Sequence, residues 1–269
     1  LLKELFPPAV VRFLRSYARS PKTSSDFTGD HASWAEAEAR CTGYNAHDIL
    51  EITRTAALKV SRGEAAFERD SVVFARMEFN FPLLAGLARA AACDGGRLSV
   101  LDFGGALGSS YFQTRPFLTG VRQVGWGIVE QPAHVACGQA EFSSEELRFF
   151  ATCDECIRAQ GPNLVLLSSV LQNLPDPYQT LNELCALGTR SLIIDRTAFL
   201  PQAEDRLTVQ TVPDCIYRAS YPAWFFNEER FIGQVRRNGY RVLADFPGAD
   251  QVSLEGSASY FKGFICLKA

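Results

Sequence analysis

The sequence predicts an α/β protein in which a doubly wound, mostly parallel sheet follows an N-terminal cap of helices. Two observations carry this prediction. After Gly95 and Gly96, short apolar runs alternate with amphipathic stretches, which is the pattern of parallel strands joined by helical crossovers. Before that point, the apolar residues recur at helical spacing. We therefore expect a helical cap over residues 1–95 and a sheet domain over residues 96–269.

The sheet is expected to contain seven strands, each a continuous apolar run of the kind that is buried on both faces. The expected strands are 98–103, 123–129, 147–150, 163–167, 191–194, 240–246 and 261–267. Helices are expected near 108–118, 131–140, 176–187 and 227–238. Only a loop separates the last two strands, so we expect the final strand to be antiparallel.

The cap is divided by its polar and apolar patterns. Residues 1–19 form a basic amphipathic segment, and residues 20–32 form a polar linker. Ser33 followed by Glu36 is a capping box that opens a short helix. Further helices are expected over residues 46–60 and 71–92.

Composition excludes several classes of protein. The chain has 269 residues, is 47% hydrophobic and carries a formal charge of −3, as an ordinary globular protein does. This slight acidity argues against a nucleic-acid partner, and no apolar run is as long as a membrane span. The eight cysteines are scattered, which suggests free thiols in a reducing cytoplasm. Cys153 and Cys156 form one isolated pair, so no metal site is expected.

The most specific motif is the glycine-rich turn that follows the first strand. A phosphate-binding loop needs a lysine after the last glycine, and the dinucleotide fingerprint needs glycines where Ala106 and Ser109 stand. The segment instead resembles the hhDhGxGxG motif of class I S-adenosylmethionine (SAM) methyltransferases, with alanine at the middle glycine. The resemblance implies that the turn curls round the cofactor and that Asp102 fixes the turn or the cofactor's amino group. The implied cofactor contacts are Asp102, Gly104, Gly105, Ala106 and Gly108.

An acidic residue at the end of the second strand supports a nucleoside ligand. Glu130 comes 22 residues after Gly108, where a carboxylate can accept hydrogen bonds from both hydroxyls of a ribose. This position suits both NAD and SAM, and the glycine spacing favours SAM. The remaining expected cofactor contacts follow the second, third and fourth strands, and they are Gln131, Ala151, Thr152, Ser168 and Ser169.

Polar and aromatic residues after the fourth and fifth strands are the candidates for acceptor binding. Ligands of open α/β sheets bind beyond the carboxyl ends of the strands. The segment 171–177 is similar to the Leu-Pro-Asp-Pro turn of many methyltransferases and lacks the Asn-Pro-Pro-Tyr form of many nucleic-acid N-methyltransferases. An insertion is expected over 197–226, a loop without regular structure whose aromatic rings either pack on sugar faces or form a local hydrophobic cluster. The acceptor candidates are Gln172, Asn173, Arg196, Tyr217, Tyr221 and Trp224.

Methylation of a hydroxyl also needs a base to remove its proton. His31 and His47 lie in the cap, which closes over the cofactor in many class I enzymes, and Asp195 ends the fifth strand. These three are the candidate catalytic residues. Asp195 and Arg196 equally suit a structural ion pair.

Several segments together resemble a family of bacterial methyltransferases associated with surface-polysaccharide biosynthesis. They are Ser33-Trp34 with Ala37, Gly43-Tyr44, 101–105 with 109–112, 194–197 and 221–224. The resemblance implies O-methylation of a sugar or glycan-type acceptor. Two alternatives remain open: a catalytically silent binding module with the same fold, and a nicotinamide-dependent sugar oxidoreductase.

The basic start of the chain allows two interpretations. A basic amphipathic helix over residues 1–19 is able to lie on the anionic inner face of a membrane, where a lipid-linked acceptor would be found. Such a helix more often docks on its own protein or on another subunit. The sequence leaves both interpretations open, and it leaves the oligomeric state open too.

Overall fold

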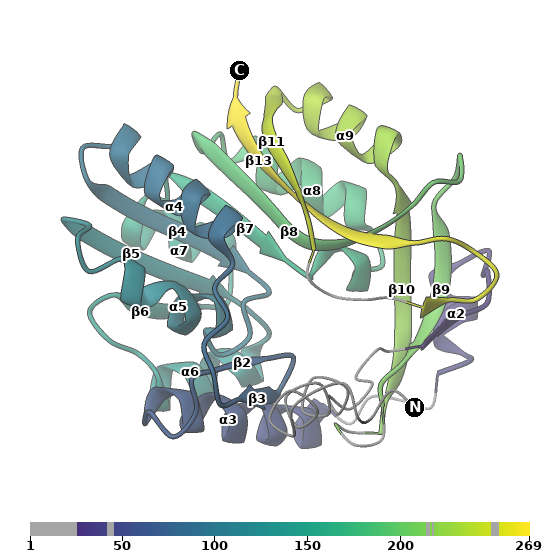
Figure 1. Cartoon of the computed structure of the whole chain (residues 1–269), viewed down its shortest axis with the longest axis horizontal. Helices are drawn as coiled ribbons and strands as arrows, with labels where there is room; N and C mark the ends of the chain where they lie inside the picture. The colour runs from purple at the N-terminus through teal and green to yellow at the C-terminus, as the bar shows by residue number, and fades with distance from the viewer. Residues whose placement is uncertain (1–25, 42–45, 214–215, 217, 249–252) are drawn as a thin grey trace, which may run out of the picture.

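A computed structural model describes residues 26–41, 46–213, 216, 218–248 and 253–269 of the chain (Figure 1). Its helices are α2 (Trp34–Glu38), α3 (Ala46–Ser61), α4 (Phe81–Cys93), α5 (Ser109–Thr114), α6 (Pro132–Glu141), α7 (Cys153–Gln160), α8 (Pro177–Ala186) and α9 (Glu228–Arg237). Its strands are β1 (Asp26–Thr28), β2 (Phe67–Arg69), β3 (Val72–Phe74), β4 (Arg97–Phe103), β5 (Gln123–Val129), β6 (Leu147–Phe150), β7 (Leu164–Ser168), β8 (Ser191–Leu200), β9 (Arg206–Thr211), β10 (Ser220–Asn227), β11 (Tyr240–Pro247), β12 (Ser253–Leu254) and β13 (Tyr260–Lys268). Two short 3₁₀ helices, η2 (Arg115–Phe117) and η3 (Leu171–Asn173), complete the described elements.

The central sheet has the predicted Rossmann-like topology. Its strands are ordered β6-β5-β4-β7-β8-β13-β11. The first five are parallel, and β13 is antiparallel to both β8 and β11. The prediction of a mostly parallel sheet whose last strand is antiparallel is therefore confirmed.

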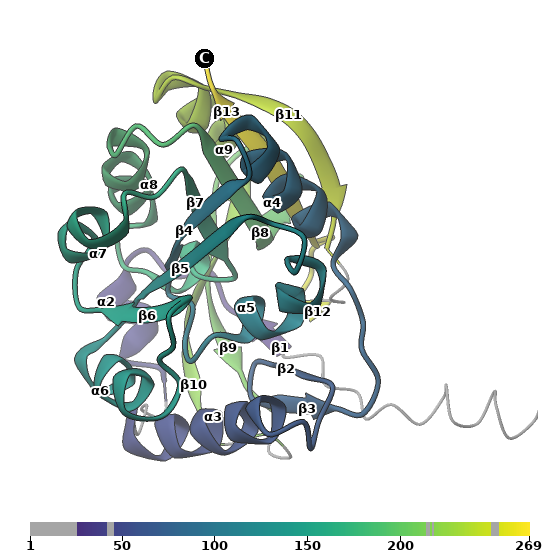
Figure 2. The same cartoon turned by 90° about the vertical axis from the view of Figure 1, so that its left-hand side faces the viewer.

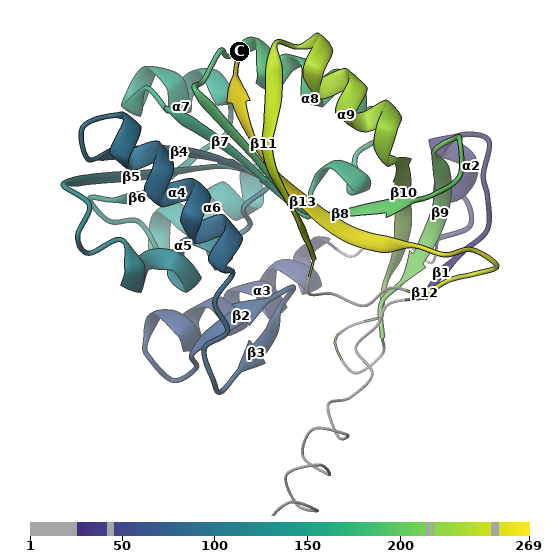
Figure 3. The same cartoon turned by 45° about the horizontal axis from the view of Figure 1, so that its top comes forward.

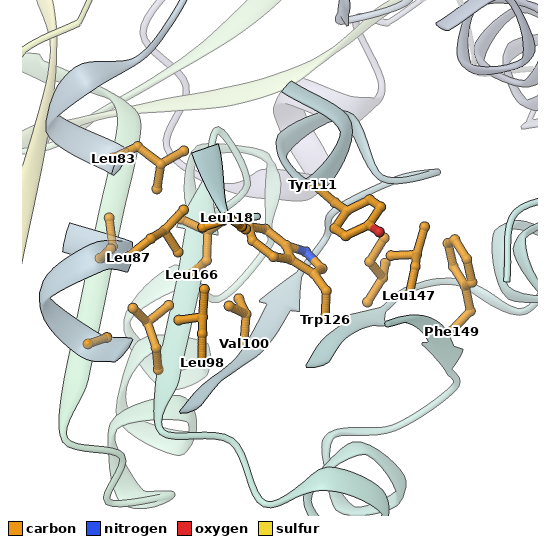
Figure 4. Close-up of a cluster of buried hydrophobic side chains, with 14 of the residues drawn as sticks. Leu83, Leu87, Leu98, Val100, Tyr111, Leu118, Trp126, Leu147, Phe149 and Leu166 are labelled. Atoms are coloured by element: carbon orange, nitrogen blue, oxygen red, sulfur yellow. The ribbon is translucent and has the colours of Figure 1, made fainter. Parts of the chain in front are cut away.

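Each face of this sheet carries its own hydrophobic core. Helices α4, α5 and α6 cover one face with α3, and α7, α8 and α9 cover the other. Figure 2 shows α4 on one side of the strands and α7 and α8 on the other. Strand β4 supplies both cores because its side chains alternate: Leu98 and Val100 join the first, shown in Figure 4, and Leu101 joins the second.

The sheet extends further than expected, and the prediction of an unstructured insertion over 197–226 is wrong. Strand β8 continues to Leu200, and β9 and β10 follow it as an antiparallel pair. Strand β10 pairs with the end of β8, and β9 pairs with β1, which in turn pairs with β12 (Figure 3). The order of the residues in β9 explains the strand, because Leu207 and Val209 alternate with polar residues and are buried against α2.

The helix expected over residues 71–92 begins ten residues later, at Phe81. A β-hairpin, β2–β3, occupies the first part of that range. Asp70 and Ser71 form its turn with φ angles of 51° and 67°, a backbone that starts no helix. Asn80 caps α4, because its side chain accepts a hydrogen bond from the Leu83 N–H at 3.0 Å.

Two smaller differences concern the segment before α2 and the connection between β6 and β7. Strand β1 lies inside the segment 20–32 that was expected to be a linker, and helix α7 was not expected. The capping box is confirmed at Ser33, whose hydroxyl accepts the Glu36 N–H at 3.3 Å. The division of the chain at residue 95 stays a prediction. Among the described residues, no helix combines the length and the apolar character needed to cross a bilayer.

Candidate functional site

The carboxyl ends of five parallel strands bring the predicted site residues to one edge of the sheet. Asp102, Glu130, Ala151, Ser168 and Asp195 lie at the ends of the parallel segments of β4, β5, β6, β7 and β8 or directly after them. Neighbouring strands keep these positions in register; Ser168, for example, pairs with Asp195. We call this region the carboxyl edge.

Asp102 is a buried carboxylate beneath the glycine-rich turn. It is 1% exposed, and its Oδ2 accepts a hydrogen bond from the Trp126 indole N–H at 2.9 Å. Its Oδ1 has no hydrogen-bond partner among the described residues. Burial raises the pKa of Asp102 to about 7, although the Trp126 hydrogen bond lowers it, and the Glu130 charge raises it further. Trp126 itself is packed among aliphatic side chains and Tyr111 (Figure 4).

The turn above Asp102 has the backbone that its glycines permit. Residues Gly104, Ala106 and Gly108 have positive φ angles of 72°, 49° and 104°. These are the three positions where the methyltransferase motif has glycine, so Ala106 adopts the conformation of the residue that it replaces. Gly105 is needed for another reason, because a Cβ there would lie 2.6 Å from the Asp102 carboxyl carbon. The turn therefore packs directly on the buried acid.

Glu130 lies at the expected place, immediately after β5. Its backbone N–H donates to the Phe150 carbonyl at 3.2 Å, and its Oε2 accepts the Gln131 N–H at 2.6 Å. Its side chain is half-buried, and Gln131 is exposed at the start of α6.

Ala151 and Thr152 immediately precede helix α7, and Thr152 is its N-cap. The Thr152 hydroxyl accepts the Glu155 N–H at 3.2 Å, and the Glu155 carboxylate accepts the Ala151 N–H at 3.0 Å. Both residues are exposed, and these contacts cap the helix. Cys153 and Cys156 follow on α7 as free thiols whose pKa values burial raises, to about 12 for Cys156.

The segment after β7 forms a polar network with β8. The Gln172 amide donates to the Ser169 hydroxyl at 3.0 Å and to the Arg196 carbonyl at 3.2 Å. The Asn173 amide donates to the Ser169 carbonyl at 3.1 Å. Gln172 Oε1 and Asn173 Oδ1 are buried without a partner among the described residues, so both amides retain a free acceptor.

Asp195 connects three elements at this edge. Its Oδ2 accepts hydrogen bonds from Asn80, at the start of α4, at 3.0 Å and from Ser168, at the end of β7, at 3.3 Å. Asp195 is 2% exposed. Arg196, the next residue, forms an ion pair with Asp70 at the tip of the β2–β3 hairpin.

The hairpin adds two acidic residues that the sequence analysis did not identify. Glu68 is 4% exposed, and its two oxygens accept hydrogen bonds from the Ser109 hydroxyl and, at 3.1 Å, from the Ser71 N–H. Burial raises the pKa of Glu68, and the Asp70 charge raises it further, against the hydrogen bond from Ser109. Through Glu68 and Asp70 the hairpin spans the carboxyl edge from the start of α5 to β8.

A weak pattern marks this hairpin in the sequence. Asp70 and Ser71 stand between Phe-Glu-Arg and Val-Val-Phe, which is a two-residue turn between runs with strand propensity. The sequence does not show that the hairpin folds over the sheet edge, because its contacts lie 41 and 126 residues away.

The other acceptor and base candidates lie elsewhere or outside the described part. His31 Nδ1 lies 3.4 Å from a Glu36 oxygen, and the imidazole lines a cavity of about 740 Å³ together with Arg40 and Arg218. His47 belongs to α3, but its side chain lies outside the described part of the chain, as does all of Tyr217.

The two remaining aromatic candidates are packed within the protein. Trp224 lies between two hydrophobic clusters, and its indole N–H donates to the Leu174 carbonyl at 3.2 Å. Tyr221 packs with Ile49, Val212 and Ala219. Their described contacts join the extended sheet to η3 and to α3.

No protein-family model and no curated protein sequence matches this chain. Solved structures with a similar fold include the N-terminal domain of EvdMO1 with S-adenosylhomocysteine (SAH) bound, at 11% identity and a TM-score of 0.47, over 84% of this chain and 98% of that one. Another is magnesium protoporphyrin IX methyltransferase from Synechocystis PCC 6803 with bound SAH, at 14% identity and a TM-score of 0.46, over 84% and 100%. A third is CalS10 with bound SAM, an amino pentose methyltransferase from Micromonospora echinaspora, at 12% identity and a TM-score of 0.42, over 70% and 91%. Identities this low say nothing about the substrate of this chain.

Proposed function

We propose that this protein is a SAM-dependent methyltransferase that methylates a hydroxyl of a sugar or glycan-type acceptor. The observation that supports the cofactor most directly is the turn at 104–108 above a buried acid. Its three positive φ angles stand at the glycine positions of the methyltransferase motif, and Glu130 lies one strand away. The dinucleotide fingerprint places its glycines differently, so this geometry favours SAM over NAD.

The residues present fit the cofactor in charge and in shape. SAM supplies a methyl group on a positively charged sulfur, which is itself the driving force for transfer. Acidic residues gather at the carboxyl edge, and Asp102 retains a buried oxygen that has no partner in the described part of the chain. Glu130 would accept hydrogen bonds from the ribose hydroxyls, and the turn at 104–108 would leave the backbone open to close approach.

The acceptor would lie beyond β7 and β8. Gln172 and Asn173 have amide oxygens to which no described residue donates, and these would accept hydrogen bonds from sugar hydroxyls. Arg196, held by Asp70, would border the same region. These side chains would orient the acceptor, and orientation is the main contribution that methyl transfer needs from a protein.

Two buried carboxylates at this edge, Asp195 and Glu68, are the candidates for the base. A base with a pKa near neutral is most effective, and the raised pKa of Glu68 moves that group in the required direction. Glu68→Gln and Asp195→Asn keep the size of each side chain. Loss of about a hundredfold or more in kcat in one variant, with unchanged cofactor affinity, would assign the base. Wild-type activity in both variants would exclude both residues.

Calorimetry with SAM, SAH and NAD tests the cofactor. We expect saturable binding of both sulfur ligands and none of NAD. If neither sulfur ligand binds at millimolar concentration, the proposal is wrong. A second measurement, transfer of labelled methyl from SAM to nucleotide sugars and to free sugars, tests the acceptor and separates an enzyme from a silent binding module.

A further inference from the structure

The opposite edge of the central sheet carries a compact basic pocket. The pocket has a volume of about 260 Å³ and lies where α4 ends beside the amino-terminal ends of β7 and β8, the start of β11 and the end of β13. Figure 2 shows α4 next to β11 and β13 near the C-terminus. Four of its lining residues are cationic: Arg89, Arg190, Arg241 and Lys268. The whole chain has a formal charge of −3, so this local excess of positive charge is a specific feature of the pocket.

The acid beside the pocket pairs with one of these four cations, Arg190. Asp94 lies 3.1 Å from the Arg97 guanidinium and 2.9 Å from that of Arg190. Hydrogen bonds from Asn163 and then Arg97 lower the pKa of Asp94, so this carboxylate is ionised and already shared between two arginines. Arg190 also donates to the Cys93 carbonyl at 3.3 Å, which compensates the negative end of α4.

Two cations of the pocket remain without an acidic partner among the described residues. Neither Arg89 nor Arg241 has an ion pair or a side-chain hydrogen bond there. The Lys268 Nζ donates to the Asn238 carbonyl at 3.1 Å and lies 4.6 Å from the centre of the Tyr240 ring, which belongs to the core of the α7–α9 face, so this cation lies on the face of the sheet opposite α4. Like charges held close together repel one another, so a bound anion would stabilise this arrangement.

The shape and lining of the pocket select the kind of anion. A volume of 260 Å³ is below the roughly 300 to 1,000 Å³ of sites for drug-sized ligands, so the pocket suits a small group rather than a whole nucleotide. Guanidinium groups bind tetrahedral oxyanions through paired N–H donors. Ser191 also lines the pocket and adds a hydroxyl.

We propose that this pocket is a phosphate-binding site, distinct from the carboxyl edge, whose main ligands are Arg89 and Arg241. The phosphate belongs either to a soluble molecule or to a lipid headgroup, because both present the same oxygens. This site does not depend on the proposed methyl transfer.

Titration of the full chain with inorganic phosphate, followed by calorimetry and by the midpoint of thermal unfolding, tests the site. We expect saturable binding at millimolar concentration and a higher midpoint. The double variant Arg89→Gln, Arg241→Gln should weaken phosphate binding by at least about tenfold, since each lost guanidinium removes a charge-assisted contact. The matched control is Arg76→Gln, Arg148→Gln, which removes the same charge from two exposed arginines elsewhere and should change the affinity by less than about twofold.

Two further arms identify the source of the phosphate. Glycerol 3-phosphate represents a soluble ligand, and vesicles that contain phosphatidylglycerol represent a lipid surface. Vesicle binding that inorganic phosphate displaces, and that the double variant loses, would assign the site to a headgroup. Binding of glycerol 3-phosphate without vesicle binding would assign it to a soluble phosphate. No saturable phosphate effect on the wild-type chain, or equal binding by the double variant and the wild type, would overturn the proposal.

Discussion

The two edges of the central sheet have opposite charge, although the same strands form both. At the carboxyl edge, Asp102, Glu130, Asp195 and Glu68 come together, and three of these acids are buried. At the amino edge, Arg89, Arg190, Arg241 and Lys268 line one pocket. This difference matches the two proposed ligands, a positively charged sulfur compound at the carboxyl edge and a phosphate at the amino edge.

The burial of the charges also differs between the edges. Burial raises the pKa of an acid, as it does for Asp102. The interactions of exposed charges are instead weakened by salt. The carboxyl edge should therefore respond to pH, and the amino edge should respond to ionic strength.

The largest effect is expected from a variant that changes the carboxyl edge alone. Glu130→Ala removes the acceptor for the ribose diol and should weaken SAH binding by about 2 to 3 kcal/mol, or roughly 30- to 150-fold. Calorimetry measures the affinity, with Glu145→Ala, an exposed acid on the loop between α6 and β6, as the control. Arg241→Gln at the amino edge should leave SAH affinity unchanged. Unchanged affinity in Glu130→Ala would show that the diol contact is wrongly assigned.

The next prediction concerns the buried acid. Burial raises the pKa of Asp102 from 3.8 to about 7, so the folded protein binds this proton more tightly than the unfolded chain. The resulting stability is fully present below the unfolded pKa and is lost as the pH rises towards 7. A shift of this size corresponds to at most about 4 kcal/mol.

Asp102→Asn removes this titration. Between pH 5 and pH 8, the free energy of unfolding of the wild type should therefore fall by up to about 3 kcal/mol more than that of the variant. Urea denaturation at the two pH values measures the difference. Glu204→Gln, which neutralises an exposed acid, should follow the wild type. An equal fall in the free energy of unfolding of the wild type and of Asp102→Asn between the two pH values would contradict the raised pKa.

A smaller effect is expected from the ion pair that holds the hairpin tip to β8. The Asp70 side chain is 61% exposed, so its pair with Arg196 should contribute less than about 1 kcal/mol to the free energy of unfolding. A double-mutant cycle with Asp70→Asn and Arg196→Gln measures this coupling. The same variants should raise KM for the acceptor more than they change SAH affinity. An equal change in both constants would mean that the hairpin serves the cofactor instead.

The smallest effect is expected from a variant in the glycine-rich turn. Ala106 has a φ of 49°, which costs an ordinary residue about 1 to 2 kcal/mol, while glycine loses about 0.5 to 1 kcal/mol more backbone entropy on folding. Ala106→Gly should therefore change the free energy of unfolding by between about 0 and +1 kcal/mol. Ala136→Gly, on the exposed face of α6, should instead lose about 1 kcal/mol. Equal losses in the two variants would contradict a strained Ala106.

The sequence alone determined the central sheet and the two motif residues of its carboxyl edge. Continuous apolar runs locate buried parallel strands, and an acid with glycines after the first run defines a tight turn, because both patterns are local. Strand β5 and the positions of Asp102 and Glu130 are those expected from the residues themselves.

Only the tertiary structure decided the rest, because it depends on contacts between residues far apart in the chain. The segment 197–226 becomes strand when β1 and β8 offer it partners, and a hairpin replaces the first part of the expected 71–92 helix. Glu68 and Asp70 reach the carboxyl edge through contacts with Ser109 and Arg196. The basic pocket likewise gathers α4, β8, β11 and β13, whose cations span residues 89 to 268 and share no motif.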